Sequence, residues 1–255
     1  MSTTNESVMP NAPILDAETY EQLPRQAVTL TDPQGPAAEQ YKMLRYRLEL
    51  LAKTGVKSLA FTSARSGEGK TTTAVNAALA LGRGGRNRVL LVDADLRHPS
   101  VHTMLGLRPR EGLCDVVAGR AALGGCLWRF GADELYVLPS GNAPDDLGRT
   151  LFDPQLGVVL ADVRNRFDFV IVDCPPVLQF ADVPTLCRDL DGAILVVRAG
   201  KTPGENVASA LDALYGVTVH GLVLNEVDPR AIIHTQMRAL PSASPHSQLA
   251  LPSGG

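Results

Sequence analysis

A glycine-rich segment followed by a lysine and two threonines carries the clearest chemistry in the sequence. Residues 63–72 read SARSGEGKTT, after a short apolar run that ends at Phe61 and before a helical pattern over residues 74–81. A glycine-rich turn between a strand and a helix aims successive backbone N–H groups and the positive end of the helix at one point. The segment therefore predicts a phosphate-binding loop.

The loop has the form of a Walker A motif, with Ala64 in place of the usual first glycine. In this motif Lys70 reaches the outer phosphates of a nucleotide, and the hydroxyl of Thr71 joins the shell of a bound magnesium ion. An alanine adopts a positive φ only at a cost. We expect Ala64 to be tolerated because the downstream Gly67 is present.

Three carboxylates follow two other apolar runs. VLLVDADLRHP places Asp93 and Asp95 directly after one run, and FVIVDCPP places Asp173 after another. Beside a phosphate loop, Asp173 and Asp93 are predicted to hold magnesium together with Thr71. Asp95 is spaced to lie further out, where it could take a proton from an attacking hydroxyl. A single such aspartate is more often a helix cap or a surface charge, but three beside one loop favour a site.

The elements that position these residues alternate along the chain. Apolar runs alternate with helical patterns such as 156–163 and 205–214, which predicts an α/β fold with a doubly wound, mostly parallel sheet. Helices cover both faces of such a sheet, and ligands bind at the carboxyl ends of its strands. The predicted strands lie within residues 58–61, 89–92, 135–138, 169–172, 193–197 and 222–224.

The composition predicts three regions. Residues 1–35 are rich in proline, threonine and acidic residues and are expected to be flexible, with at most short ordered pieces. Residues 36–228 form the phosphate-loop domain, which begins with an amphipathic helix after Pro36. Residues 229–255 turn to alanine, serine and proline and are expected to be a flexible tail.

The bulk properties are those of an ordinary cytoplasmic protein. The 255 residues carry a net charge of −3, which gives no basic footprint for nucleic acid. No apolar run approaches the roughly 20 residues of a membrane helix, and the polar N-terminus is no secretion signal. The cysteines lack C-x-x-C spacing and are expected to be reduced, small apolar residues. They are Cys114, Cys126, Cys174 and Cys187.

Taken together, the motifs resemble those of bacterial tyrosine kinases of capsule and exopolysaccharide assembly. The segments that carry the resemblance are SARSGEGKTT, VLLVDADLRHP and FVIVDCPPVLQFADVPTL, followed by DGAILVVRAGKTP. These kinases belong to the deviant Walker A P-loop ATPases, which include the MinD and ParA proteins. ParA-type proteins typically have D-x-D-P-Q where this chain has D-x-D-x-R, so Arg97 favours the kinase branch. The resemblance extends from about Pro36 to Asp228.

The resemblance implies a role for each matching residue. It places ATP phosphates on Ser66, Gly67, Glu68 and Gly69 with Lys70, and a magnesium ion among Thr71, Asp93 and Asp173. Catalytic roles fall to Lys70, Asp93, Asp95 and Arg97, of which Asp95 lies near the incoming tyrosine hydroxyl and Arg97 binds a partner segment or stabilises charge. Thr72 and Asn225 complete the nucleotide site, Asn225 as a residue that reads adenine. For Asn225 a plain turn residue is an equal alternative. Arg65 stands where MinD-type relatives have a signature lysine, with surface salt-bridging as an equal alternative.

The resemblance also implies partners. EQYKMLRYR is similar to the E-x-x-R-x-x-R element with which such kinases form rings, and Lys42 stands in place of the first arginine. Lysine keeps the charge but lacks the planar fork for bidentate pairing. A homo-oligomer through the helix at residues 39–45 is expected, with a weaker or different contact. The family further implies recruitment to the inner face of the membrane by a membrane-embedded polysaccharide co-polymerase or activator.

One family feature is missing from the sequence. Family kinases usually end in a cluster of tyrosines, and this chain has none beyond Asp228. Tyr41, Tyr46, Tyr136 and Tyr215 are expected to be packing residues, which leaves Tyr20 as the one acceptor in a flexible segment. Three functions therefore stay open. They are a magnesium- and ATP-dependent tyrosine kinase, a nucleotide-switched pseudokinase that regulates the co-polymerase, and a MinD- or ParA-like positioning ATPase.

Overall fold

The computed structural model describes residues 14–15, 25–130, 134–142 and 147–228. Residues 1–225 form one compact unit, and residues 226–255 form a second, of which 226–228 are described. Most of the segments predicted to be flexible, together with Tyr20, lie outside the described residues. The proposed domain limits therefore stay a prediction.

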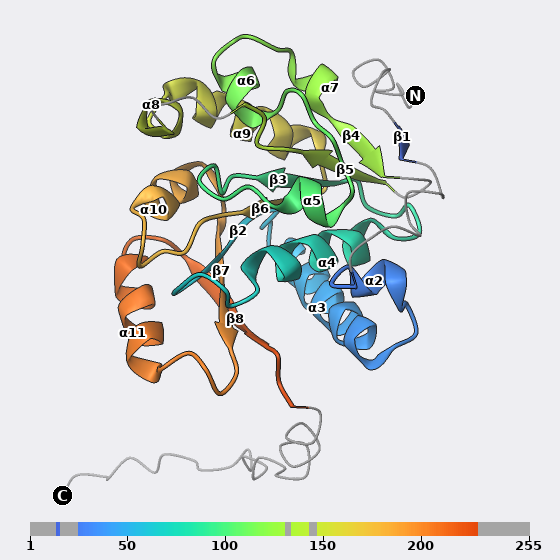
Figure 1. Cartoon of the computed structure of the whole chain (residues 1–255), viewed down its shortest axis with the longest axis vertical. Coiled ribbons are helices and arrows are strands. Elements are labelled where there is room, and N and C mark those ends of the chain that lie inside the picture. Colours follow the sequence, from blue (N-terminus) through green and yellow to red (C-terminus); the bar gives the residue numbers. More distant parts are fainter. Residues whose placement is uncertain (1–13, 16–24, 131–133, 143–146, 229–255) are drawn as a thin grey trace, which may run out of the picture. The chain divides into compact units, whose positions relative to one another are not determined.

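The described strands form a single sheet, shown edge to edge in Figure 1. Its order is β1-β4-β5-β3-β6-β2-β7-β8, and every neighbouring pair is parallel except β4 with β5. This arrangement confirms the predicted α/β class with a mostly parallel sheet. The strands are β1 (Ile14–Leu15), β2 (Ser58–Ser63), β3 (Val89–Asp93), β4 (Trp128–Phe130), β5 (Leu135–Leu138), β6 (Phe169–Asp173), β7 (Gly192–Arg198) and β8 (Val219–Asn225).

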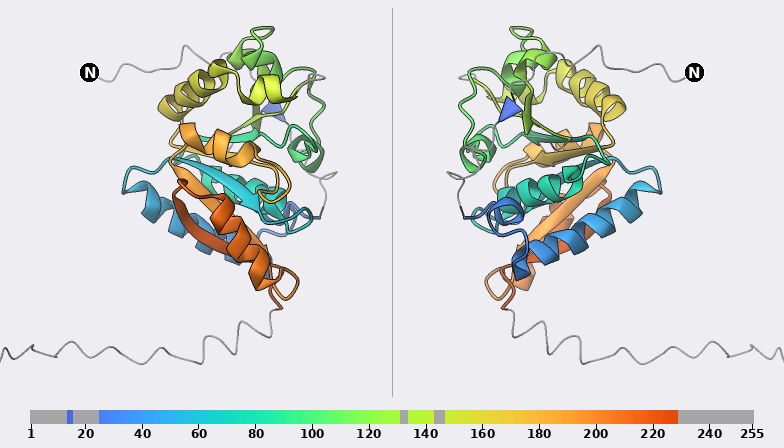
Figure 2. Two further views of the ribbon diagram at one scale, coloured as in Figure 1. Left: turned by 90° about the vertical axis from the view of Figure 1, so that its left-hand side faces the viewer. Right: turned by 90° about the vertical axis from the view of Figure 1, so that its right-hand side faces the viewer.

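Helices cover both faces of the sheet (Figures 1 and 2). On one face α3 and α4 pack over a core that includes Phe61 and Ile171. On the other face α9, α10 and α11 pack over a core that includes Val172 and Leu195. The helices are α2 (Val28–Thr31), α3 (Pro36–Ala52), α4 (Lys70–Gly82), α5 (Val101–Met104), α6 (Leu113–Val117), α7 (Leu123–Cys126), α8 (Leu147–Leu151), α9 (Pro154–Arg166), α10 (Asp182–Leu186) and α11 (Gly204–Ala213), with a 3-10 turn at Cys187–Asp189. None of these described helices combines the length and the apolar run that a membrane span requires.

The three central strands, β2, β3 and β6, bring the predicted site residues together. All of their residues are buried, because a parallel sheet covered on both faces selects continuous apolar runs. In the register of the sheet Asp93 lies opposite Asp173, and Asp173 lies opposite Phe61. The carboxyl ends of the three strands therefore meet where β2 runs into the glycine-rich loop.

Local sequence explains the start and the burial of α9. The carboxylate of Asp153 accepts a hydrogen bond of 2.9 Å from the backbone N–H of Gln155, and Pro154 opens the first turn. Buried residues then follow at helical spacing, as the sequence pattern predicted. They are Leu156, Val159, Leu160 and Val163.

Asn76 in α4 attaches the segment that precedes α3. Its side-chain oxygen accepts a hydrogen bond of 3.0 Å from the backbone N–H of Thr29. Its amide nitrogen donates to the backbone oxygens of Gln26 and Thr72, both at 2.8 Å. Because Thr72 lies in the first turn of α4, this one buried amide joins α2 to the helix that follows the phosphate loop.

Two of the four tyrosines that were expected to be packing residues are buried or partly buried, and the other two are exposed. Tyr136 is buried, and its ring meets that of Phe167 edge to face with centroids 5.4 Å apart. Tyr41 is partly buried, which raises the pKa of its hydroxyl. Tyr46 and Tyr215 are 54% and 94% exposed, so the expectation was wrong for these two. Tyr215 follows the end of α11 and points away from the core on which that helix packs.

All four cysteines are buried and free, in agreement with their predicted role as small apolar residues. Burial raises the pKa of each thiol, to about 11 for Cys114 and Cys126 and to about 12 for Cys187. The thiolate is the reactive form of cysteine, so these groups are chemically quiet.

Asp191 holds the amino-terminal ends of β2 and β7 together, at the edge of the sheet opposite the phosphate loop. Its Oδ2 accepts hydrogen bonds from the backbone N–H of Lys57 and of Ser58, at 2.8 and 2.9 Å, and from Ser58 Oγ at 3.0 Å. Arg164 of α9 donates to its Oδ1 at 2.8 Å. Burial opposes the charged carboxylate, but these donors outweigh burial and lower the pKa of Asp191 to about 2.

We predict that Asp191→Ala lowers the free energy of unfolding by about 2–3 kcal/mol at pH 7, because buried donors lose a charged acceptor. Since the folded pKa lies below the unfolded one, this contribution is present above pH 4 and is lost as the pH falls toward 2. The difference between wild type and variant in denaturant unfolding should therefore shrink at pH 3. Asp212→Ala, at an exposed site on α11, is the matched control and should change stability little. An Asp191→Ala protein as stable as this control would contradict the assignment.

Candidate functional site

The loop between β2 and α4 adopts a backbone that needs glycine at two positions. Gly67 and Gly69 have φ values of 81° and 89°, in the left-handed region that other residues rarely adopt. Gly69 directly precedes α4, which begins at Lys70. Ala64 is fully buried and is not among the residues with positive φ, so its backbone makes no demand for glycine. The replacement of the first glycine of the motif thus costs the loop no strain.

Glu68 braces this loop from within. Its side chain is only 6% exposed. One carboxylate oxygen accepts a hydrogen bond from the backbone N–H of Arg65 at 3.1 Å, and the other accepts from Thr202 Oγ1 at 2.6 Å. Thr202 lies between β7 and α11 and also accepts from the backbone N–H of Arg198. The Glu68 side chain therefore fixes the loop and is turned to its own protein partners rather than to the cavity, which it does not line.

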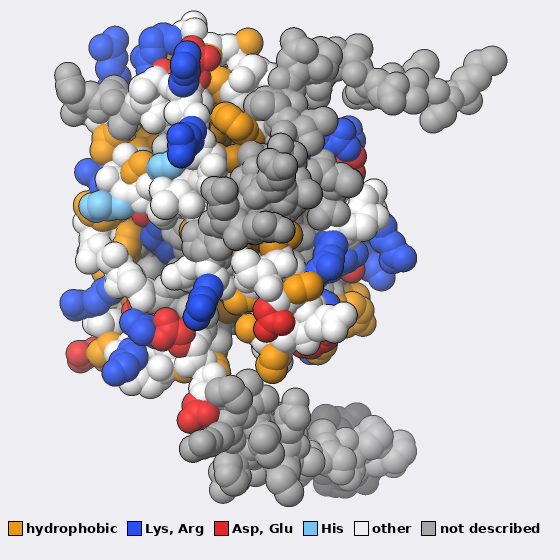
Figure 3. Space-filling view, turned by 45° about the vertical axis from the view of Figure 1, so that its right-hand side comes forward, with side chains coloured by type: hydrophobic (Ala, Val, Ile, Leu, Met, Phe, Trp, Pro, Cys, Tyr) orange, Lys and Arg blue, Asp and Glu red, His pale blue; other side chains and the backbone are white. Residues whose placement is uncertain are grey.

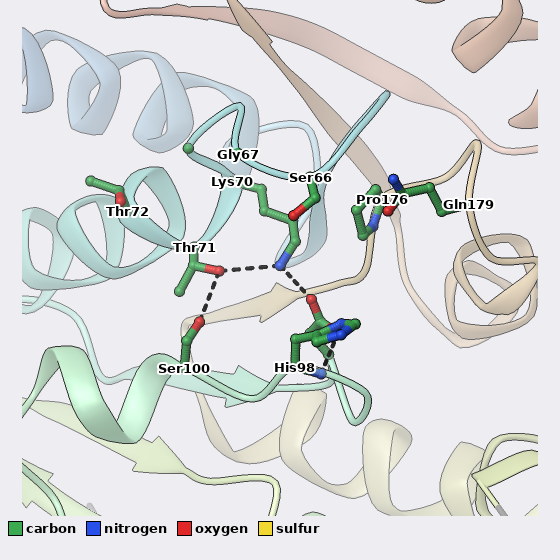
Figure 4. Close-up of a pocket in the computed structure, with 11 residues that line it drawn as sticks. Ser66, Gly67, Lys70, Thr71, Thr72, His98, Ser100, Pro176 and Gln179 are labelled. Atoms are coloured by element: carbon green, nitrogen blue, oxygen red, sulfur yellow. Dashed lines mark hydrogen bonds and ion pairs between the residues drawn. The ribbon is translucent and has the colours of Figure 1, made fainter.

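Lys70 lies between the loop and the carboxylates. Its Nζ is 2.7 Å from Asp95 Oδ2, 3.5 Å from Asp173 Oδ1 and 3.1 Å from Thr71 Oγ1. Figure 4 shows the Lys70 side chain extending from the start of α4 into the cavity, with its amine beside the Thr71 hydroxyl. Burial disfavours the charged amine, but Asp173 and Asp95 outweigh burial, so the pKa of Lys70 is raised. The ammonium group is thus fully charged at neutral pH and available to phosphate oxygens.

Asp93 and Asp173 form a pair of buried carboxylates at the ends of adjacent strands. Burial, reinforced by the charge of the neighbouring Asp173, raises the pKa of Asp93 well above its usual value. Burial likewise raises the pKa of Asp173 to about 6, although Lys70 and the hydroxyl of Thr71 oppose the shift. Two carboxylates in this position repel each other unless a cation or a proton lies close by.

In the same pair, one oxygen of each carboxylate accepts no hydrogen bond. Asp93 Oδ2 accepts from the backbone N–H groups of Ser100 and Val101, both at 3.1 Å, while its buried Oδ1 accepts no hydrogen bond. Asp173 Oδ2 accepts from Thr71 Oγ1 at 2.6 Å, and its Oδ1 also accepts none. Oxygen ligands of this kind suit magnesium. The described residues contain no cluster of three acidic, histidine or cysteine side chains suited to a metal, so waters and phosphate oxygens would complete the shell.

A cavity of about 490 Å³ opens beside Lys70. In Figure 4 His98, Ser100, Pro176 and Gln179 line it opposite the loop. Asp95 reaches it as well, held by a hydrogen bond of 3.1 Å from the backbone N–H of His98 to Oδ1. Its lining residues are Ser66, Gly67, Gly69, Lys70, Thr71, Thr72, Asp95, His98, Ser100, Pro176 and Gln179. The structure thus brings Lys70, Thr71, Thr72 and Asp95 to one cavity together with every predicted loop residue except Glu68, while Asp93 and Asp173 lie behind its wall.

Asn225 lies against the same loop from the end of β8. Its side-chain nitrogen donates to the backbone oxygen of Glu68 at 3.1 Å. A Cβ on Gly69 would come within 1.9 Å of this nitrogen, so the Asn225 amide in its present position uses the space that Gly69 leaves open. The position is compatible with a residue beside the base of a nucleotide, a role that stays a prediction.

Arg97, which the resemblance assigns to a partner segment or to charge stabilisation, is held by protein groups. Its guanidinium forms a bidentate pair with Asp182 of α10, at 2.9 and 3.3 Å, and stacks over the ring of Phe180 at 4.5 Å from the centroid. It is not among the residues that line the cavity. Arg97 therefore joins the segment after β3 to the segment after β6.

Sequence reasoning missed several residues of this site. His98, Ser100, Pro176, Gln179 and Thr202 entered none of the predicted sets. The first four lie within seven residues of Asp93 or Asp173, so their closeness to the two carboxylate motifs was the available signal. Thr202 comes from the far side of β7 and had no local signal.

The helix predicted to mediate assembly uses one of its motif residues internally. Arg45 of α3 pairs with Glu49 at 2.8 Å and donates to the backbone oxygens of Ala80 and Arg83 at the end of α4. Glu39 and Lys42 pair with each other on the surface. Arg65 is exposed in the loop, and within the described ranges its guanidinium has no ion pair within 4 Å.

Comparison with known proteins agrees with this geometry. Residues 56–200, more than half of the chain, match the family described as AAA domain. The chain is 36% identical over 191 residues to the tyrosine-protein kinase YwqD of Bacillus subtilis (strain 168), an alignment that covers 74% of this chain and 80% of that protein. It is 29% identical over 219 residues to the succinoglycan biosynthesis transport protein ExoP of Rhizobium meliloti (strain 1021), which covers 84% of this chain and 28% of that protein.

A solved structure supports the fold. The kinase domain of the Escherichia coli tyrosine kinase ETK is similar with a TM-score of 0.76 at 24% identity, covering 98% of this chain and 95% of that chain. At this identity the likeness concerns the fold.

We predict that the free energy of unfolding of the nucleotide-free protein falls as the pH rises, because the buried carboxylate Asp173 becomes charged. The folded pKa of Asp173 is about 6 and exceeds the unfolded value of 3.8, so the folded state binds its proton more tightly between these limits. Stability from this group is complete below pH 4 and is lost as the pH rises through 6. Asp173→Asn should therefore gain about 1–3 kcal/mol relative to wild type between pH 4 and pH 7, measured by denaturant unfolding without magnesium.

The exposed Asp212→Asn serves as the control for this series and should show the same difference from wild type at both pH values. A difference between wild type and Asp173→Asn that does not change with pH would show that the carboxylate pair is already relieved by another group.

Proposed function

The chain belongs to the family of bacterial tyrosine-protein kinases, within the AAA-domain proteins, and from this premise we propose that it transfers the γ-phosphoryl group of ATP to tyrosine in exopolysaccharide or capsule biosynthesis. One observation supports the proposal above the others. The buried Lys70 joins a phosphate loop to Asp95 and Asp173 at the ends of neighbouring strands. That arrangement suits a phosphoryl group held between a cation and a base.

The loop and Lys70 would bind the triphosphate. Backbone N–H groups of residues 66–69 would donate to the phosphate oxygens, and Lys70 would meet the β- and γ-phosphates. Magnesium bound with ATP supplies the positive charge that neutralises the phosphate oxygens during transfer. Thr71, Asp93 and Asp173 would hold that ion, because two of their carboxylate oxygens are buried without a hydrogen bond.

Asp95 would act as the base. In the transfer a tyrosine oxygen forms a bond to the γ-phosphorus, the bond from that phosphorus to the bridging oxygen breaks, ADP leaves and the hydroxyl proton passes to Asp95. Without nucleotide, Asp95 Oδ2 is paired with Lys70. Phosphate oxygens compete for the same ammonium group, so nucleotide binding would release Asp95 to accept the proton.

The exposed tyrosines are the candidate acceptors within the chain. Tyr215 and Tyr46 present their rings to solvent, and Tyr20 lies outside the described residues. Tyr136 is buried against Phe167 and is no acceptor in the folded chain. Transfer to a second protein is the other route.

The family supports a proposal for the partner and the location. We propose a cytoplasmic protein that is recruited to the inner face of the membrane by the cytoplasmic tail of a polysaccharide co-polymerase or activator. Self-assembly would use α3, where Met43 and Tyr46 are 57% and 54% exposed. Because Arg45 is already bound to the end of α4, Glu39 and Lys42 are the motif residues left for a neighbouring copy. The domain itself is proposed to span residues 36–228, between the flexible segments 1–35 and 229–255.

Transfer can be tested with labelled ATP and magnesium, using the chain itself and a glutamate–tyrosine copolymer as acceptors. We predict phosphotyrosine in the wild type and its loss in Asp95→Asn. Lys70→Met should bind ATP about 10- to 100-fold more weakly, because the phosphates lose a charged donor. Unchanged ATP binding by Lys70→Met would contradict the account of the loop.

The same assay separates the alternatives. Tight ATP binding without any phosphotyrosine would favour a nucleotide-switched pseudokinase, and steady phosphate release without phosphotyrosine would favour a MinD- or ParA-like positioning ATPase. Self-phosphorylation that falls in Tyr215→Phe, Tyr46→Phe or Tyr20→Phe identifies the acceptor, with Tyr136→Phe as the matched control.

Arg97 is predicted to act through Asp182 rather than on the acceptor. Arg97→Ala and Asp182→Ala should then lower the transfer rate by a similar factor, about tenfold, and the double variant should be no worse than either one. Arg97→Lys should restore little, because lysine lacks the planar fork. A normal rate in Asp182→Ala together with a large loss in Arg97→Ala would instead place Arg97 on the acceptor.

A further inference from the structure

A second cavity lies apart from the nucleotide site, between the segment that precedes α6 and the start of β4. Its volume is about 270 Å³, and it shares no lining residue with the cavity beside Lys70. In Figure 3 lysine and arginine side chains gather at the top of the molecule, where Figure 1 places α6 and α7. The lining residues are Arg108, Arg110, Glu111, Gly125 and Trp128.

The charged side chains that line this cavity do not form ion pairs with one another. Arg108 and Arg110 are exposed, and within the described ranges neither guanidinium lies within 4 Å of a carboxylate. Glu111 is exposed as well and forms no ion pair there. Two arginines and one glutamate leave the lining with an excess positive charge. Guanidinium groups bind carboxylate and phosphate in a bidentate manner, so the lining suits a ligand with one anionic group.

The backbone that carries these charges is held firmly. Asp115 of α6 accepts hydrogen bonds of 3.0 Å from the backbone N–H groups of Gly112 and Asn142. The side chain of Asn142 donates to the backbone oxygen of Arg110 at 2.6 Å. A Cβ on Gly112 would come within 2.2 Å of the backbone oxygen of Pro139, so the segment approaches the end of β5 as closely as a backbone can. The backbone that carries the two arginines is therefore fixed by hydrogen bonds and close packing.

Trp128 and Gly125 give the cavity its apolar side. Trp128 is half-buried at the start of β4 and packs on the apolar core that α3 and α4 cover. A Cβ on Gly125 would meet no atom within 4 Å, so open space lies over this residue. An indole beside open space offers a flat apolar surface with one polar N–H group.

We propose that this cavity binds an anionic sugar, with the sugar ring against Trp128, its anionic group on Arg108 and Arg110, and its hydroxyl groups donating to Glu111. Pockets for larger ligands measure about 300–1,000 Å³, so the cavity fits a single ring better than an extended chain. The choice of a sugar over another anion of that size rests on the proposed function in polysaccharide biosynthesis. The anionic group could be the phosphate of a sugar phosphate or the carboxylate of a uronic acid.

The chain contains a single tryptophan, and it lines this cavity, so its fluorescence reports on this site alone. The full-length protein without ATP is titrated with glucose 1-phosphate and, separately, with glucuronate. We expect a saturable change in fluorescence in the millimolar range for at least one of the two, and the one that acts identifies the anionic group. Methyl glucoside, which is neutral, should give no saturable change.

Three variants test the geometry. Arg108→Ala and Arg110→Ala should each weaken the apparent affinity about tenfold. Gly125→Phe should abolish the change by filling the open space, while Arg188→Ala, at an exposed arginine elsewhere, should leave it intact. Circular dichroism and thermal unfolding verify that each variant is folded.

The proposal is overturned if neither anionic sugar changes the fluorescence, if the change persists in the Arg108→Ala, Arg110→Ala double variant, or if a phosphotyrosine peptide binds while the sugars do not. These results are independent of transfer. Saturable sugar binding in a protein that makes no phosphotyrosine would contradict the proposed function and leave this site standing.

Discussion

Buried negative charge at the carboxyl ends of β3 and β6 is the constraint on which the site depends. The in-register pairing of these strands sets Asp93 opposite Asp173, both fully buried. Burial raises the pKa of both groups, reinforced by the charge of Asp173 at Asp93 and by that of Asp95 at Asp173, and Lys70 supplies the nearby positive charge. The buried negative charge lowers the stability of the fold. It also favours the binding of a cation together with the phosphates of a nucleotide, because the site has more negative than positive charge.

The position of the loop is fixed from several sides at once. Glu68 is bound to Thr202 beyond β7, Asn225 at the end of β8 is bound to the backbone of Glu68, and Asn76 ties the first turn of α4 to α2. Catalytic and binding geometry has to be held within fractions of an ångström by groups that do not themselves react. Here those groups come from strands and helices that are widely separated in the sequence.

Local patterns carried most of the fold and the centre of the site. Continuous apolar runs predicted the buried parallel strands, and carboxylates directly after them predicted the meeting of Asp93 and Asp173, because parallel strands end at one edge. Short strands that are continuously apolar, such as β5, were still predicted, whereas β4 and the short helices α5 to α8 show no clear period and were missed. The pairing of Arg97 with Asp182 joins residues 85 positions apart, and the exposure of Tyr215 depends on where α11 ends. The sequence around these residues predicts neither feature.

The contact between Gly69 and Asn225 has a consequence for protein engineering. The Asn225 amide occupies the space beside Gly69 that a side chain would need, and it donates a hydrogen bond to the loop, so the phosphate loop and the end of β8 are in direct contact. A loop grafted onto another scaffold without residue 225 would lose the hydrogen bond from the Asn225 amide. A circular permutation that opened the chain near β8 would likewise remove support from a loop that lies more than 150 residues away in the sequence. The sequence motif is therefore smaller than the physical unit that an engineer would have to move.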